Sequence, residues 1–277
     1  MKDKTPAGSG APPLAHRLFR TIDHVLARGG HPVVVLDVDL TLLDTRPRTR
    51  KILADYLHAR PMDLAARRDA LDRLWCRPLR FSIVDNLRAL GIEDDEIRAQ
   101  ALPFWKTRFF SGPYCALDVP LAGAPEACRA LHAAGATLVY ASARHARTMA
   151  AATVQTFLDY GIPVATAGAV LALKEDPDEP DGAFKARVAD HAARMGTVVA
   201  AADNEPGHCN VFRRRLPEAI VAWVDTAHHP GAPPLDAGIA PIAGVVDLVP
   251  EPQRAARVCD ARRPAAGPPR TSPKGAR

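Results

Sequence analysis

Long apolar runs are missing from this chain of 277 residues, and none approaches the roughly 20 residues that a transmembrane helix needs. The first residues, MKDKTPAGSGAPP, also lack the apolar segment of a secretory signal peptide. Cysteine is sparse, and its odd count and the lack of C-x-x-C spacing argue against a disulfide framework. We therefore expect a cytoplasmic protein with reduced thiols and no contact with a membrane. The five cysteines are Cys76, Cys115, Cys128, Cys209 and Cys259.

Positive charge is in excess only at the carboxyl end of the chain. The formal net charge is +5, and the segment from Glu251 to Arg277 holds seven Lys or Arg and two acidic residues, which accounts for the whole excess. A neutral body does not favour binding to a nucleic-acid backbone. The segment 251–277 is rich in Pro, Gly and Arg, so we predict a disordered basic tail, and residues 1–13 are predicted to be a disordered leader.

Apolar periodicity between these ends alternates between helix and strand. This alternation predicts an α/β fold with a doubly wound, mainly parallel, Rossmann-like sheet. The expected helices are 14–28, 124–134, 147–160, 183–195 and 206–216. The expected strands are 33–36, 137–142, 197–203 and 219–224, with a short strand at 163–166, an acidic loop at 174–182 and an edge element at 244–249.

Residues 46–114 differ from the rest, because they carry helical periodicity and little that resembles a strand. Breaks at Pro61, Pro78, Gly91 and Pro103 predict three or four helices. We interpret this segment as a helical insertion in an α/β core formed by residues 14–45 and 115–250. Most of its arginines are expected to lie on a solvated helix face, although they could also favour an anionic substrate.

Three polar clusters follow predicted strands: DVDLT, ASAR and ADNEP. Because the carboxyl ends of parallel strands meet at one edge of a sheet, we expect these clusters to converge there. Asp37 and Asp39 are two residues apart in extended chain, so both should project on one side. Two close carboxylates repel each other unless a cation is bound or one is protonated, and Mg²⁺ favours such oxygen ligands.

These clusters resemble the motifs of the haloacid-dehalogenase-like hydrolase superfamily, whose first motif is hhhhDxDx[T/V]. VVVLDVDLT fits that motif, and Ser142 after TLVYAS fits the second. Lys185, in GAFKARVADH, fits the third, and Asp203, which closes TVVAAAD, fits the fourth. The resemblance covers about residues 31–224 and implies the fold expected above, with the insertion as a C1-type cap.

For catalysis, the resemblance implies that Asp37 is the nucleophile and forms an aspartyl-phosphate intermediate. Asp39 is then the general acid for the leaving group and the base for the attacking water. Ser142 is implied to hydrogen-bond the transferring phosphoryl group, and Lys185 to neutralise its charge. Arg144, just beyond Ser142, is a further candidate near the substrate or the cap.

For the metal, the resemblance implies Mg²⁺ held by Asp37, Asp203 and the backbone carbonyl of Asp39. Asn204 takes a place where many relatives have a second acid, so it is a weaker candidate ligand. Asn204 and Glu205 could equally cap the following helix. Lys174 remains a competitor of Lys185. The histidines show no paired spacing of metal ligands, which argues against zinc.

Within the family, Asp39 favours phosphate-ester hydrolysis over dehalogenation, because halide release needs no general acid. A capped site suggests a small phosphorylated substrate, so the leading hypothesis is a Mg²⁺-dependent phosphatase. Two alternatives remain: a nucleic-acid end phosphatase that uses the basic tail, and a non-catalytic protein that binds a phosphorylated ligand. The sequence does not identify the substrate or the oligomeric state.

Overall fold

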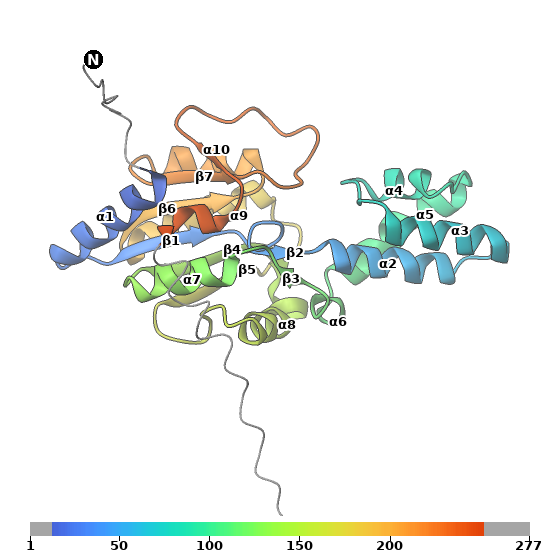
Figure 1. Ribbon diagram of the computed structural model, residues 1–277, viewed down its shortest axis with the longest axis horizontal. Helices are drawn as coiled ribbons and strands as arrows, with labels where there is room; N and C mark the ends of the chain where they lie inside the picture. Colours follow the sequence, from blue (N-terminus) through green and yellow to red (C-terminus); the bar gives the residue numbers. More distant parts are fainter. Residues whose placement is uncertain (1–12, 252–277) are drawn as a thin grey trace, which may run out of the picture.

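The computed structural model describes residues 13–251, so the predictions for the leader and the tail lie outside the described residues. Six parallel strands form one sheet with the order β5-β4-β1-β6-β7-β8 (Figure 1). This confirms the predicted fold class, and β1 lies in the interior between β4 and β6. The strands are β1 (Pro32–Leu36), β4 (Thr137–His145), β5 (Ala169–Lys174), β6 (Thr197–Asp203), β7 (Ile220–Val224) and β8 (Ala240–Ile242).

Helices cover both faces of the sheet, because the side chains of β1 alternate between two cores. Val34 and Leu36 pack in one core with residues of α1 (Leu14–Ala27), α7 (Ala124–Ala133) and α8 (Ala146–Asp159). Val33 and Val35 pack in the other core with residues of α9 (Asp181–Met195) and α10 (Pro206–Arg215). A strand buried on both faces reads as a continuous apolar run, as VVVL does.

The insertion forms a separate helical unit beside the sheet, hereafter the cap (Figure 1). Leu53, Leu57, Leu74 and Leu87 belong to a core of its own. Its helices are α2 (Arg46–His58), α3 (Leu64–Cys76), α4 (Ile83–Ala89) and α5 (Asp95–Phe109), and the short α6 (Gly112–Cys115) then packs against α8.

Two short antiparallel strands join the cap to the sheet. In this hinge, β2 (Leu43–Asp44) pairs with β3 (Val119–Pro120), so the outgoing and returning chains are held side by side. The chain leaves the sheet side at β2 and returns at β3, with α2 to α6 between them.

Some local predictions were wrong. Residues 163–166 form no strand, because Pro163 cannot donate a ladder hydrogen bond and Ala165 has φ +52°; the strand is β5, after a turn at Gly168. Pro103 does not end a helix but lies inside α5, whose packing against α2 and α4 outweighs the lost backbone hydrogen bond. The segment 244–249 contains a 3-10 helix, η1 (Val245–Leu248), and the edge strand is β8.

Candidate active site

A tight turn follows β1 and presents the two aspartates. The Val38 carbonyl accepts hydrogen bonds from the backbone N–H groups of Leu42 and Leu43, both at 2.9 Å. Leu40 has φ +60°, and its carbonyl accepts a hydrogen bond from Thr226 Oγ1 at 2.6 Å. A non-glycine residue in this region is strained, and such strain is often found where a loop positions functional groups.

Lys185 brings Asp37 and Asp203 together. Its buried Nζ donates to Asp37 Oδ1 at 2.6 Å, Asp203 Oδ2 at 2.7 Å and the Ala141 carbonyl at 2.7 Å. The strands β4, β1 and β6 are neighbours in the sheet, so the end of each contributes one of these acceptors. The three predicted clusters therefore meet at one edge, as expected.

Burial and neighbouring charges shift the pKa values of the two carboxyl groups in this cluster in opposite directions. Burial and the negative charge of Asp203 raise the pKa of Asp37 to about 6, although Lys185 opposes them. Burial also raises the pKa of Asp203, but Lys185 and His208 outweigh it and lower the pKa to about 2. Burial lowers the pKa of Lys185, but the two carboxylates outweigh it and raise that pKa above its usual value. Asp203 is thus the firmly anionic member.

One carboxylate oxygen in the cluster is uncommitted. Asp37 Oδ2 is buried and has no hydrogen-bond partner in the structure. A buried anionic oxygen without a partner is costly, and a divalent cation would satisfy it. No group of three His, Cys, Asp or Glu side chains suited to a metal occurs in residues 13–251, and the Asp39 carboxylate is bound by Arg144. Mg²⁺ is commonly bound by one or two carboxylates plus substrate and water, so Asp37 and Asp203 fit it.

Asp39 lies in a different charge cluster from Asp37. Arg144 donates to Asp39 Oδ1 from Nε at 2.8 Å and from a terminal nitrogen at 2.6 Å. Arg144 also contacts Asp118 at 2.6 Å, and Arg48 contacts Asp118 at 3.0 Å and Asp39 at 3.5 Å. Burial raises the pKa of Asp39, but Arg144 and Arg48 outweigh it and hold the pKa below its usual range. In this arrangement Asp39 is ionised.

Sequence reasoning missed Arg48 and Asp118, and it gave Arg144 a different place. The Arg144 guanidinium is buried and is bound to Asp39, Asp118 and Thr153, and Arg144 does not line the cavity described below. It is placed to position Asp39 rather than to contact a substrate. Arg48 was counted with a solvated helix face, yet it is fully buried. Only the hinge, which brings α2 next to residue 118, reveals this pairing.

The other candidates are placed as follows. Ser142 is buried and lines the cavity, and its Oγ accepts a hydrogen bond from the Arg144 backbone N–H at 3.3 Å. Asn204 donates to the Ala227 carbonyl at 2.7 Å, which directs its Oδ1 toward Thr41 Oγ1 at 3.5 Å. Lys174 binds Asp181 and lies outside the Asp37 cluster, so Lys185 holds the site instead.

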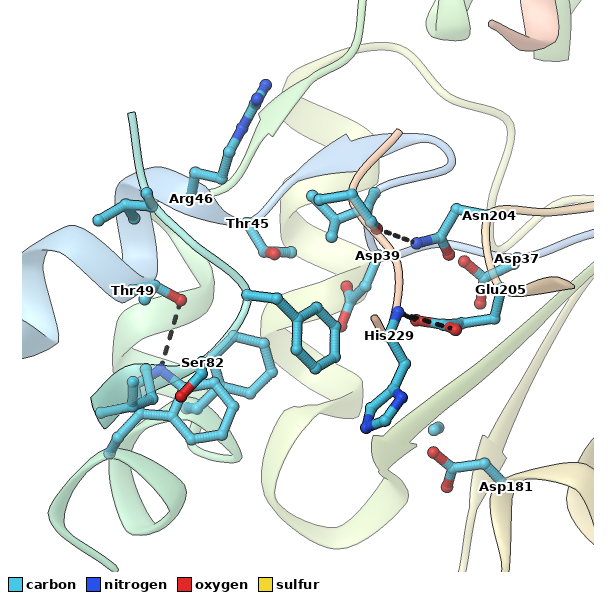
Figure 2. A pocket seen from close by; sticks show the side chains of 18 of the residues that line it. Asp37, Asp39, Thr45, Arg46, Thr49, Ser82, Asp181, Asn204, Glu205 and His229 are labelled. Carbon is cyan, nitrogen blue, oxygen red and sulfur yellow. Dashed lines mark hydrogen bonds between the residues drawn. The ribbon is translucent and has the colours of Figure 1, made fainter. Parts of the chain in front are cut away.

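Two residues beside Asp203 complete this side of the site. The Glu205 carboxylate accepts a hydrogen bond from the backbone N–H of His229 (Figure 2). His208 Nδ1 lies 3.3 Å from Asp203 Oδ1. Sequence reasoning did not predict this contact, because it looked only for paired histidine spacing typical of metal ligands.

The aspartates lie at the floor of a cavity of about 650 Å³ between the sheet edge and the cap. Figure 2 shows Asp37, Asp39, Asn204 and Glu205 on one side, and Thr45, Thr49 and Ser82 of the cap region on the other. A cavity of this volume accommodates a small organic ligand. Its floor combines the buried ammonium group of Lys185 with the uncommitted oxygen of Asp37, an arrangement suited to an attack on a phosphoryl group.

Comparisons with known proteins find likeness at the level of structure. No protein-family model matches the chain, and no curated protein matches it by sequence. Solved structures that match across most of the chain include haloacid dehalogenase-like hydrolases and dehalogenases.

Three of these structures illustrate the range. A subfamily IA hydrolase of this superfamily from Geobacter sulfurreducens is 12% identical, with 84% of this chain and 97% of that chain covered and a TM-score of 0.47. A family hydrolase from Deinococcus radiodurans with bound phosphate and sodium is 17% identical, with 84% and 96% covered and a TM-score of 0.43. A defluorinating L-2-haloacid dehalogenase is 14% identical, with 79% and 93% covered and a TM-score of 0.45. This likeness concerns the fold alone.

Among the helices of residues 13–251, none combines the length and the apolarity required to cross a bilayer. The four cysteines in this part of the chain, Cys76, Cys115, Cys128 and Cys209, are free thiols. Cys259 lies outside the described residues.

Proposed function

We propose that the protein is a Mg²⁺-dependent phosphatase that hydrolyses a small phosphomonoester through an aspartyl-phosphate on Asp37. The observation that carries this proposal is the convergence of Asp37, Asp203 and Lys185 beneath the cavity, with Asp37 Oδ2 left uncommitted. Asp37 lines the cavity and its Oδ2 is buried without a hydrogen-bond partner, which supports a bound cation or a reacting group at this oxygen.

In the first step, a carboxylate oxygen of Asp37 forms a bond to phosphorus as the bond from phosphorus to the ester oxygen breaks. Lys185 holds Asp37 in place by a 2.6 Å hydrogen bond and offsets the negative charge that gathers on the phosphoryl group. Ser142 lines the same floor and donates its hydroxyl to a phosphoryl oxygen. The departing oxygen takes a proton from the protonated Asp39 carboxyl group, which gained it from water in the preceding turnover, and leaves as the alcohol.

In the second step, water attacks phosphorus, which releases inorganic phosphate and restores the Asp37 carboxylate. Asp39 is suited to take the proton of that water, because Arg144 and Arg48 keep it ionised. Its role as general acid in the first step requires its carboxyl group to leave Arg144 and accept a proton.

Mg²⁺ would be held by Asp37 and Asp203, with the Asp39 carbonyl and Asn204 as further candidate ligands, and it supplies positive charge that shields the phosphate from the nucleophile. Asp203 is anionic over the whole neutral range, because its pKa is about 2. The bound cation would also satisfy Asp37 Oδ2.

The test is hydrolysis of para-nitrophenyl phosphate with added Mg²⁺ by the wild type and by Asp37→Asn. Asparagine keeps the shape of the side chain but is a poor nucleophile, so we expect kcat to fall at least about 1,000-fold. Circular dichroism and the melting temperature check that the variant is folded. Asp190→Asn, in a surface ion pair with Arg215, is the matched control and is expected to retain activity. Comparable turnover by Asp37→Asn would exclude Asp37 as the nucleophile.

A further inference from the structure

The cavity above the aspartates has two chemically different walls. Its floor at the sheet edge is polar and includes Asp37, Ser142 and Lys185. Its opposite wall comes from the cap and is formed largely by apolar side chains, although aromatic residues make up only 5% of the sequence. The cap side chains used below are Leu79, Phe81, Leu102, Trp105, Phe109 and Phe110.

Three aromatic rings of this wall, those of Trp105, Phe109 and Phe110, contact one another, and Phe81 lies apart from them. Trp105 and Phe109 stack with ring centroids 4.2 Å apart, and Phe110 meets Phe109 edge-on at 5.3 Å. Phe81 reaches from the cap to His229 of the core, with ring centroids 5.3 Å apart. The rings therefore line the space on the cap side and across to the loop after β7.

Two of the apolar side chains of this wall remain partly exposed to solvent. Phe81 is 48% exposed and Leu102 is 40% exposed, yet both line the cavity. Exposed apolar groups in a concave site are typical of a surface that a ligand covers.

Three of the five polar side chains on the cap side of the cavity are already engaged, whereas no hydrogen bond or ion pair engages the side chains of Arg80 and Thr45 within residues 13–251. Thr49 Oγ1 accepts a hydrogen bond from Trp105 Nε1 at 3.3 Å, as the dashed line beside Thr49 in Figure 2 shows. Ser82 Oγ accepts one from the Asp85 backbone N–H at 3.3 Å, and Arg46 binds Asp44 at 2.7 Å. A sugar or a nucleobase would find Arg80 and Thr45 as the unengaged polar side chains of a wall that is otherwise mostly apolar, and it would lose its own water there.

We infer that the organic part of the substrate is apolar and carries an aromatic ring, which the cap residues Phe81, Leu102, Trp105, Phe109 and Phe110 enclose while the phosphate faces Asp37 and Lys185. This inference rests on the proposed function for the phosphate end of the substrate. An aromatic ring fits because offset and edge-to-face contacts with neighbouring rings add to the burial of apolar area. Such a substrate is an arylalkyl or aryl phosphate monoester, rather than a sugar phosphate or a nucleotide.

The test compares 2-phenylethyl phosphate with ethyl phosphate, since both release a primary alcohol and differ only in the ring. Glucose 6-phosphate serves as a polar comparison of similar size. We expect kcat/KM to be about 10- to 100-fold higher for 2-phenylethyl phosphate than for ethyl phosphate, as burial of one ring implies. A ratio below about 3, or a preference for glucose 6-phosphate, would overturn the inference.

Variants of the wall assign the preference to the cap. Phe81→Ala and Leu102→Ala each alter an exposed side chain, so both should fold, and each is expected to lower the kcat/KM ratio several-fold. Trp75→Ala is the matched control, because Trp75 is 59% exposed on the same cap but does not line the cavity. It should leave the ratio unchanged. A fall in the ratio for Trp75→Ala as large as that for Phe81→Ala would count against the assigned wall.

A binding measurement separates this inference from the proposed function. The non-hydrolysable 2-phenylethyl phosphonate and ethyl phosphonate are titrated into the wild type, with tryptophan fluorescence as the readout because Trp105 lines the cavity. If the protein hydrolyses no phosphate ester at all, the proposed function fails, while tighter binding of the phenyl compound still supports an aromatic site. Active enzyme that binds both phosphonates equally would contradict the aromatic site alone.

Discussion

At the scale of single residues, one buried ammonium group holds two carboxylates that would otherwise repel each other. Lys185 donates to Asp37 and Asp203, so a second cation near this cluster supplements a charge balance that already exists. The unpartnered Oδ2 of Asp37 marks the side from which that cation would approach. The contribution of Lys185 to the free energy of unfolding can therefore be tested without measuring turnover.

We predict that Lys185→Met lowers the free energy of unfolding by about 3 kcal/mol in the absence of Mg²⁺, because it leaves two buried carboxylates unpaired. Added Mg²⁺ should restore more stability to this variant than to the wild type, since the ion would take over the neutralisation of Asp37 and Asp203. Urea denaturation with and without Mg²⁺ measures both effects. Lys174→Met is the control, because Lys174 is also buried but binds Asp181 outside the cluster. Mg²⁺ should stabilise this variant no more than it stabilises the wild type. An equal Mg²⁺ effect on all three proteins would contradict the prediction.

At the scale of secondary-structure elements, the hinge between cap and sheet is fastened by buried charges. Arg48 on α2 and Arg144 on β4 both contact Asp118, which directly precedes β3. All three side chains are fully buried, so this ion cluster joins one helix of the cap to the edge of the sheet that carries Asp39. The same ion cluster therefore contacts both the cap and Asp39.

We predict that Asp118→Ala lowers the free energy of unfolding by about 3 kcal/mol or more, because it leaves two buried guanidinium groups short of a partner. Asp44→Ala, at the same hinge, removes an ion pair to the half-exposed Arg46 and should cost less than about 1 kcal/mol. Urea denaturation of the two variants gives the comparison. Equal losses would mean that the buried cluster does not fasten the hinge.

The elements differ in how far the sequence predicted them. VVVL and TVVAAAD were identified as strands because buried parallel strands form continuous β-branched or small apolar runs, and the acids that follow them came together as the parallel topology requires. AVLALK was missed, since it adjoins the acidic loop, and its role as β5 depends on pairing with β4. The contacts of Arg48, Asp118 and Arg144 could not be predicted, because Arg48 and Asp118 are 70 positions apart and meet only through the fold of the hinge.

At the scale of the whole molecule, the cap and the core also touch through aromatic contacts. Phe110, at the end of α5, stacks on His145, at the end of β4, with ring centroids 4.4 Å apart and an interplanar angle of 7°. Burial lowers the pKa of His145, and Lys174 lowers it further, although Asp181 and Asp178 oppose them. The stacked contact between His145 and Phe110 therefore favours the neutral form of the imidazole ring.

The sign of the pH effect follows from this direction. Because the pKa of His145 is lower in the folded protein than in the unfolded chain, the unfolded chain binds the proton more readily. The stability that His145 contributes is fully present above its unfolded pKa of about 6.5. It is lost as the pH falls from that value through the lower pKa of the folded protein. His145→Phe keeps an aromatic ring for the stack on Phe110 but cannot be protonated.

We therefore predict that the melting temperature of His145→Phe exceeds that of the wild type by more at pH 5 than at pH 7.5. All other titratable groups are present in both proteins. The change with pH in the difference between their melting temperatures therefore reports on His145. His24→Phe, on α1 and outside the stacked contact, is the matched histidine-to-phenylalanine variant against which the effect of His145→Phe is compared. A constant difference between wild type and His145→Phe across this range would show that the stacked contact does not sense protonation, and it would leave the hinge cluster as the main link between cap and core.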